Sequence, residues 1–137
     1  MKSTVRVLKA CLCGPEDVAK EINIAQEVIT ECNLQHSDGL NCYVKHQHWM
    51  TDATPDVSDR SQAIINRQMI DEADIVVAIF WSRFGTPTGQ AQSGTEEEIR
   101  RGVEQSKKVM VYFSDLEPLP PTSDARQLAQ LSAFRQF

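Results

Sequence analysis

The chain alternates between short runs of apolar residues and longer stretches in which apolar residues recur every three or four positions. The apolar runs occupy Thr4–Cys13, Leu40–Trp49, Ile75–Trp81 and Val109–Phe113. Runs of this length that are rich in β-branched residues predict β-strands. Because the last two runs are uninterrupted, we expect both of these strands to be covered on both faces, with Ile75–Trp81 at the centre of a sheet.

The stretches between these runs have helical spacing. Val18, Ile22, Ala25 and Ile29 form the apolar stripe of a helix that we expect to start at Glu16 and end near Asn33, before the turn-forming Ser37-Asp38-Gly39. Three further helices are expected at Asp59–Glu72, Glu96–Gln105 and Asp124–Phe137. Strands that alternate with helices predict a mostly parallel sheet with right-handed crossovers. The simplest such architecture is an α/β, flavodoxin-like, doubly wound sheet of four to five strands with helices on both faces.

The composition is that of a single globular domain over residues 1–137, either complete or the N-terminal part of a longer protein. A net charge of −5 argues against direct binding of nucleic acid or an anionic membrane, because both need a basic surface. No apolar run reaches the roughly 18 residues of a membrane span, and no signal peptide is recognisable, so we expect a cytoplasmic protein. We expect reduced, buried cysteines and no metal site, since neither Cys11-x-Cys13 nor His46-x-His48 favours one.

The candidate chemistry lies after the central strand, in a Gly/Pro/Thr-rich loop and the helix start that follows it. Ligands of open α/β sheets bind outside the carboxyl ends of the strands, so a site is expected here. The helix start carries three consecutive acids, Glu96–Glu98. The first two have a base four residues later (Arg100 and Arg101), whereas Glu98 has Gly102, which leaves room for a ligand. A carboxylate in this place is suited to stabilise or attack a sugar carbon with oxocarbenium character.

The same acids also have a purely structural interpretation. Thr95 and Glu98 have the spacing of a capping box, in which the Thr side chain accepts from the Glu98 N–H and the Glu side chain accepts from the Thr95 N–H. Acids in a first helical turn also suit the helix dipole. From spacing alone, both the catalytic and the capping interpretation stay open.

Three side chains after the central strand are candidates for substrate binding. Arg83 is either a fork-shaped donor for a phosphate or a solvated loop charge. Trp81 and Phe84 offer rings on which a nicotinamide or adenine base can stack, although Trp81 at a strand end can equally belong to the core. Weaker candidates for the same cleft are Trp49, Gln62 and Asn66.

Longer motifs around these residues resemble known families. Gly94-Thr95-x-x-Glu98 resembles the pattern of nucleoside 2-deoxyribosyltransferases, whose Glu is the nucleophile at the anomeric carbon, and its placement resembles the catalytic Glu of Toll/interleukin-1 receptor (TIR)-type NAD-cleaving domains. Residues 5 to about 114 are similar to a bacterial TIR-like family, often fused to nucleotide-driven or ligand-sensing modules in antiphage defence. The segments that carry this similarity are Pro15–Val18, Trp49–Asp52, Gln62–Gln68 and Phe80–Gly89. Where that family usually has a Ser and an Arg, this chain has Gly14 and Ile22.

The resemblance implies a TIR-like NAD+ glycohydrolase that cleaves the nicotinamide–ribose bond, with NAD+ as substrate and no cofactor. It implies Glu98 as the catalytic residue, and as substrate-binding residues Gly14, Trp81, Arg83, Phe84, Gly94 and Thr95. It also implies an effector of bacterial immunity, activated by assembly into a homo-oligomer and fused to or associated with a sensor or NTPase module. Two alternatives remain: a nucleoside or nucleotide N-glycosidase or deoxyribosyltransferase that uses the same Glu, and a non-catalytic TIR-like domain for self-association.

Overall fold

The sheet of the protein has four strands, all parallel. The computed structural model describes residues 4–48, 67–85, 94–117, 119–120 and 123–136. Its strands are β1 (Arg6–Cys13), β2 (Cys42–Gln47), β3 (Ile75–Phe80) and β4 (Lys108–Phe113), in the order β2-β1-β3-β4. This is the strand order of the flavodoxin-like fold, and it confirms the fold expected from the sequence.

The two central strands are staggered. β1 pairs with β2 from Arg6 to Cys11, but with β3 only from Ala10 to Cys13. Cys13 lies level with Ala78, so β3 continues for two residues beyond the end of β1. The carboxyl end of β1 therefore stops two residues short of the end of β3 but extends two residues beyond the end of β2, at the point where the chain order changes direction across the sheet.

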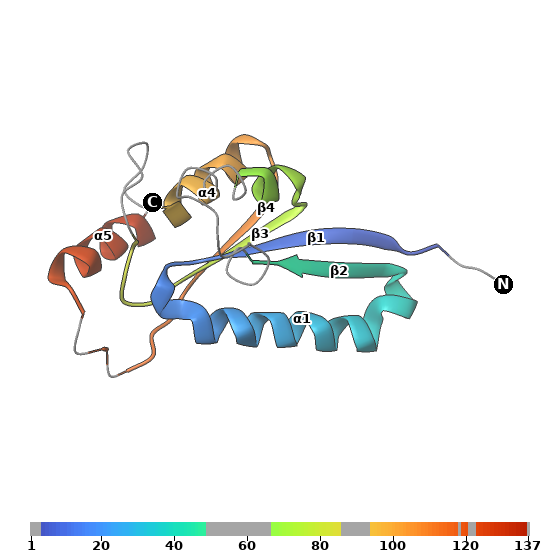
Figure 1. Ribbon diagram of the computed structural model, residues 1–137, viewed down its shortest axis with the longest axis horizontal. Helices are drawn as coiled ribbons and strands as arrows, with labels where there is room; N and C mark the ends of the chain where they lie inside the picture. Colours follow the sequence, from blue (N-terminus) through green and yellow to red (C-terminus); the bar gives the residue numbers. More distant parts are fainter. Residues whose placement is uncertain (1–3, 49–66, 86–93, 118, 121–122, 137) are drawn as a thin grey trace, which may run out of the picture.

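Helices cover both faces of the sheet (Figure 1). On one face, α1 (Ala19–Leu40) packs its apolar stripe on β1 and β3. On the other face lie α4 (Gly94–Glu104), α5 (Ala125–Arg135) and a helical segment at residues 67–72. Their shared core holds a cluster of phenylalanines in which rings stack or tilt at centroid distances of 5.3 to 5.7 Å. The cluster consists of Phe80, Phe84, Phe113 and Phe134.

The first helix is longer than its sequence predicts. A short 3-10 turn, η1 (Glu16–Val18), leads into α1, which continues past the expected end near Asn33 and through the expected turn. Asn33 is buried against β2, where its side-chain amide bonds both the N–H and the C=O of Val44 at 2.9 and 2.8 Å. The helix ends only at Asn41, which adopts the left-handed conformation with φ of 52°.

Strand β4 also differs from its prediction. Its apolar run was expected to be covered on both faces, but β4 lies at the edge of the sheet and exposes Tyr112. Of the helix expected at Asp59–Glu72, residues 67–72 are helical and the rest lies outside the described residues, as do Trp49, Gln62 and Asn66. Among the helices of the described part, none is long and apolar enough to cross a membrane.

Candidate functional site

The Glu98 carboxyl group lies against Cys13, the last residue of β1. Part of the Glu98 side chain is exposed, but its carboxyl is desolvated and hydrogen-bonded to the thiol of Cys13. The pKa of Glu98 rises from its usual 4.5 to about 7. Burial is the largest cause of this rise, the hydrogen bond from Cys13 opposes it, and the charge of Glu97 adds to it. At neutral pH this carboxyl group is therefore close to half protonated, which is unusual for a glutamate and common at functional sites.

Cys13 is a neutral, buried partner for that carboxyl. The residue is 1% exposed, and its sulfur lies 3.6 Å from the carbonyl oxygen of Val77 on the neighbouring strand. Burial, followed by the charge of Glu98, raises the pKa of the Cys13 thiol well above its usual value. A thiol of this kind is a weak hydrogen-bond donor and not a thiolate nucleophile.

The other two acids of α4 have cationic partners. Glu96 pairs with Arg100 at 3.3 Å, as its spacing predicts. The predicted pair of Glu97 with Arg101 is present only as a favourable charge interaction, because the Arg101 guanidinium makes its two bonds, of 2.8 and 2.9 Å, to Asp71. Glu97 instead lies 3.9 Å from Arg67, on the helical segment at residues 67–72. Within the described part of the chain, no ion pair involves Glu98.

Two expectations about the surroundings of Glu98 are wrong. Gly102 does not leave room for a ligand, because a Cβ there would lie 3.1 Å from a methyl of Val76 and 3.2 Å from one of Val109. Its role is to let α4 approach the sheet closely. The capping interpretation also fails: α4 already includes Gly94, so the buried Thr95 lies inside the helix, and the Glu98 carboxyl is bonded to Cys13.

Gly14 and Arg83 border the same edge of the sheet. A Cβ on Gly14 would lie 2.6 Å from the carbonyl oxygen of Ile79, so this glycine allows β1 and β3 to pack closely as they end. Next to it, the Asp17 carboxylate accepts bonds from the Ser82 N–H and hydroxyl at 2.9 and 2.6 Å, which joins the loops after β1 and β3. Arg83 lies 3.9 Å from Glu16; the Arg83 side chain is about half exposed and the Glu16 side chain is largely exposed.

The two candidate stacking residues differ in position. Phe84 is 1% exposed and stacked on Phe80, so its ring belongs to the core and leaves no face for a ligand. Trp81 is half-buried, and its indole N–H donates to the Leu116 carbonyl at 3.0 Å.

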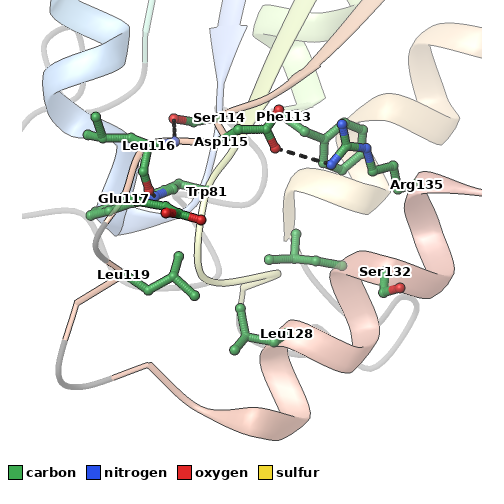
Figure 2. A pocket seen from close by; sticks show the side chains of 11 residues that line it. Trp81, Phe113, Ser114, Asp115, Leu116, Glu117, Leu119, Leu128, Ser132 and Arg135 are labelled. Carbon is green, nitrogen blue, oxygen red and sulfur yellow. Dashed lines mark hydrogen bonds and ion pairs between the residues drawn. The ribbon is translucent and has the colours of Figure 1, made fainter.

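Trp81 lines a pocket of about 290 Å³ at the ends of β3 and β4 (Figure 2). Leucines and the ring of Phe113 supply apolar walls, while serine, aspartate and glutamate side chains supply polar groups. Arg135 of α5 reaches across to Asp115 at 3.3 Å and lies 5.2 Å from the centroid of the Phe113 ring. This pocket is at the small end of the range for ligand sites, roughly 300–1,000 Å³, and Glu98 is not among the residues that line it.

Comparison with known families places almost the whole chain in one of them. Residues 16–137 match the family described as Domain of unknown function (DUF4062). The chain belongs to the DUF4062 family. No curated protein and no solved structure matches it. The matched region of this DUF4062 domain includes Glu98, Trp81 and the pocket, while Cys13 and Gly14 precede it.

Sequence reasoning missed two residues that shape the site of this DUF4062 domain. Gln127 of α5 accepts bonds from the N–H groups of Phe84 and Gly85 at 2.6 and 2.9 Å, and donates to the Gly85 carbonyl at 3.2 Å. Gly85 itself has φ of 121°, which explains the glycine there. Cys13 was assigned only a packing role, because its contact with Glu98 joins residues far apart in the sequence. In the described part of the domain, no group of three potential ligands is placed to hold a metal ion.

Proposed function

We propose that this DUF4062 domain is a NAD+ glycohydrolase that cleaves the bond between nicotinamide and ribose, with Glu98 facing the sugar. The observation that carries the proposal is the desolvated Glu98 carboxyl at the carboxyl edge of a parallel sheet, bonded to a neutral thiol. Substrates of such folds bind at this edge. A desolvated carboxylate that has no ion-paired cation among the described residues is matched to a substrate that brings its own positive charge.

The charge of NAD+ fits the electrostatics of Glu98. The nicotinamide ring carries a positive charge, and a cation near a buried carboxyl favours the ionised form and lowers its pKa. Binding of the substrate would therefore ionise the carboxyl, whose pKa is about 7 without it. As the glycosidic bond breaks, the bonding electron pair leaves with nicotinamide and the positive charge moves to the ribosyl ring. The Glu98 carboxylate stabilises or captures that ring until water attacks the anomeric carbon.

The remaining parts of the substrate have candidate partners around the same edge. In this proposal, Trp81 and its pocket take the adenine ring, because a flat base can lie against the indole and the leucine walls. Arg83 is half-exposed and only loosely paired with Glu16, so its guanidinium is accessible to a phosphate. Gly94 and Thr95 begin α4, whose N–H groups would face the ribose or the phosphates. Gly14 would contribute by allowing the substrate to lie close to its backbone. Assembly of several copies and a role in bacterial immunity remain part of the proposal.

One observation favours a second candidate, a nucleoside or nucleotide N-glycosidase or deoxyribosyltransferase. A carboxyl with a pKa of about 7 carries a proton much of the time at neutral pH. Neutral nucleosides need a proton on the departing base, whereas nicotinamide leaves NAD+ without one. Glu98 is therefore also suited to general-acid catalysis on a neutral nucleoside.

The test is to incubate the purified domain with NAD+ and follow nicotinamide release by chromatography. We expect release by the wild type, a loss of at least about 100-fold in Glu98→Gln, and little change in the matched control Glu97→Gln. Equal release by wild type and Glu98→Gln would remove Glu98 from the chemistry. No release, even when the domain is fused to an oligomerising scaffold, would contradict the glycohydrolase and favour a self-association role.

A panel of nucleosides and nucleotides, assayed in the same way for free base, tests the second candidate. Release of a neutral base without any cleavage of NAD+ would replace the first assignment by the second. Recovery of intact nucleosides and nucleotides, with no free base, would contradict the second candidate, and would contradict both candidates if NAD+ also stayed intact.

A further inference from the structure

The thiol of Cys13 lies between two acceptors that it cannot serve at once. One is the carbonyl oxygen of Val77, 3.6 Å from the sulfur, and the other is the Glu98 carboxyl. A thiol has one proton to donate and can also accept a hydrogen bond weakly. At 1% exposure, Cys13 is out of reach of bulk water, so its proton must go to one of these two groups.

We propose that Cys13 is a positioning residue whose thiol changes hydrogen-bond partner with the protonation state of Glu98. When Glu98 is ionised, the thiol donates to the carboxylate. When Glu98 is protonated, the carboxyl O–H donates to the sulfur, and the thiol turns to donate to the Val77 carbonyl. No covalent bond forms or breaks at sulfur. One hydrogen bond joins Cys13 to Glu98 in either state, and in the protonated state the thiol makes a second one, to the Val77 carbonyl.

The arrangement explains how a buried carboxyl can exist in both forms without leaving its place. Each state offers a partner to the carboxyl, so neither leaves a polar group of Glu98 buried and unpaired. Because the thiol is a weak donor, it supports the charged form less than a hydroxyl or an amide would. The inference rests on the proposed function for its catalytic meaning: Cys13 would set the pH range in which the Glu98 carboxylate is ready to meet a cationic sugar.

Among the described residues, the charged groups near Glu98 have partners of their own. On its own helix, Glu97 acts on Glu98 as a like charge and has Arg67 as its partner at 3.9 Å. On the segment at residues 67–72, Asp71 is held by Arg101. On β1, the charge of Cys11 raises the pKa of Cys13, and Cys13 is the residue that is hydrogen-bonded to Glu98. The response of Glu98 to pH should therefore depend chiefly on burial and on Cys13.

The test compares Cys13→Ser with Cys13→Ala, two replacements of nearly equal size that differ by one hydroxyl donor. The titration of the Glu98 carboxyl is followed by ¹³C NMR and assigned with Glu98→Gln. We expect the midpoint of Cys13→Ser to lie below that of Cys13→Ala by roughly one pH unit, because a hydroxyl supports the carboxylate and a methyl does not. Cys11→Ser is the matched control on the same face of β1 and should leave the Glu98 midpoint unchanged.

Identical midpoints in the Ser and Ala variants would overturn the inference, as would an equal shift in Cys11→Ser. If Cys13→Ala does not fold, the comparison of Cys13→Ser with wild type decides, and a Ser midpoint at or above that of wild type is the contradicting result. The pH midpoint of the NAD+ cleavage rate should shift across the variants in the same direction as the pH midpoint of the Glu98 titration. If wild type cleaves no NAD+ and the carboxyl titrations still separate, the proposed function fails and the hydrogen-bond exchange stands.

Discussion

Among single residues, Glu98 should make the stability of the fold depend on pH. Its pKa rises from 4.5 to about 7 on folding, so between these values the folded chain binds more protons than the unfolded chain. Stability is then highest below about pH 4.5 and falls as the pH rises through 7. At about 1.4 kcal/mol per pKa unit, the loss reaches at most about 3.5 kcal/mol.

Urea unfolding at pH 5 and pH 8 measures this prediction. Wild type should lose up to about 3 kcal/mol more than Glu98→Gln between the two values, because the amide has no proton to lose. Asp71 does not interfere with this comparison. The hydrogen bond from Arg101 lowers the pKa of Asp71 to about 2, so Asp71 changes the stability only at pH values below about 4. Parallel changes in the two proteins would mean that the Glu98 carboxyl is solvated.

Two glycines of the chain should respond to alanine in opposite directions. A Cβ on Gly14 would lie 2.5 Å from a Val18 methyl and 2.6 Å from the Ile79 carbonyl oxygen, whereas Gly39 has open space around it within α1. We expect Gly14→Ala to cost roughly 1–3 kcal/mol and Gly39→Ala to stabilise by about 0.5–1 kcal/mol through helix propensity. Chemical denaturation of both variants provides the comparison, and a stable Gly14→Ala protein would show that β1 and β3 end further apart.

At this scale, the sequence predicted which acid differs, but not what it contacts. The i+4 rule separated Glu98 from its neighbours and gave the Glu96–Arg100 pair correctly. It missed the main partner of Arg101, because a two-bond contact with the distant Asp71 is stronger than a single-helix pair. The thiol partner of Glu98 lies on β1, and no local spacing rule reaches that far.

Among the elements, α1 is hydrogen-bonded to β2 through one side chain, that of Asn33. Asn33 is 8% exposed and bonds both backbone groups of Val44. Replacing it by Leu should cost roughly 1–3 kcal/mol per backbone group left unpaired. Gln35→Leu is the control on the exposed side of the same helix, and we expect its free energy of unfolding to stay within about 0.5 kcal/mol of wild type. Similar losses in both variants would contradict the role of Asn33.

The errors at element scale have a common cause in long-range contacts. Ser37-Asp38-Gly39 is a sound turn signal by composition, yet α1 runs through it, because the Asn33 contact and the left-handed Asn41 fix a later end. The apolar run of β4 suggested a covered strand, yet its place in the sheet depends on which strands pair with it. By contrast, α5 begins within one residue of its expected start, and the Asp124 carboxylate caps it by accepting from the Arg126 N–H at 2.7 Å.

Across the whole molecule, the strand order predicts where the fold is most resistant to opening. Within the described sheet, β1 and β3 each pair with two strands, and most of the residues that pair them with each other are buried, while β2 and β4 each pair with one strand. In hydrogen exchange followed by NMR, the amides of Ala10–Cys13 and Val76–Phe80 should exchange only through global unfolding. Amides of α5 and β4 should exchange at least tenfold faster through local opening. Equal protection of β3 and β4 would contradict this ranking.

The fold as a whole was the most predictable feature. Alternation of apolar runs with helical stripes gives the order of elements, and right-handed crossovers then restrict the sheet to a few arrangements, of which the observed one is among the simplest. Ile75–Phe80 lies at the centre, as its uninterrupted run predicts. The stagger of β1 against its neighbours is a matter of register, which the pattern of residues leaves open.

That stagger also determines how the domain would bear a mechanical load. A force applied at the N-terminal end of β1 acts along a strand that is paired to β2 by six residues and to β3 by four, both running parallel to it. To move, β1 would have to slide past both partners, so all of those pairs share the load at once. A force on α5 instead meets side-chain packing and the Gln127 bonds, which can yield one after another. The domain should therefore resist a pulling force applied at β1 more strongly than one applied at α5.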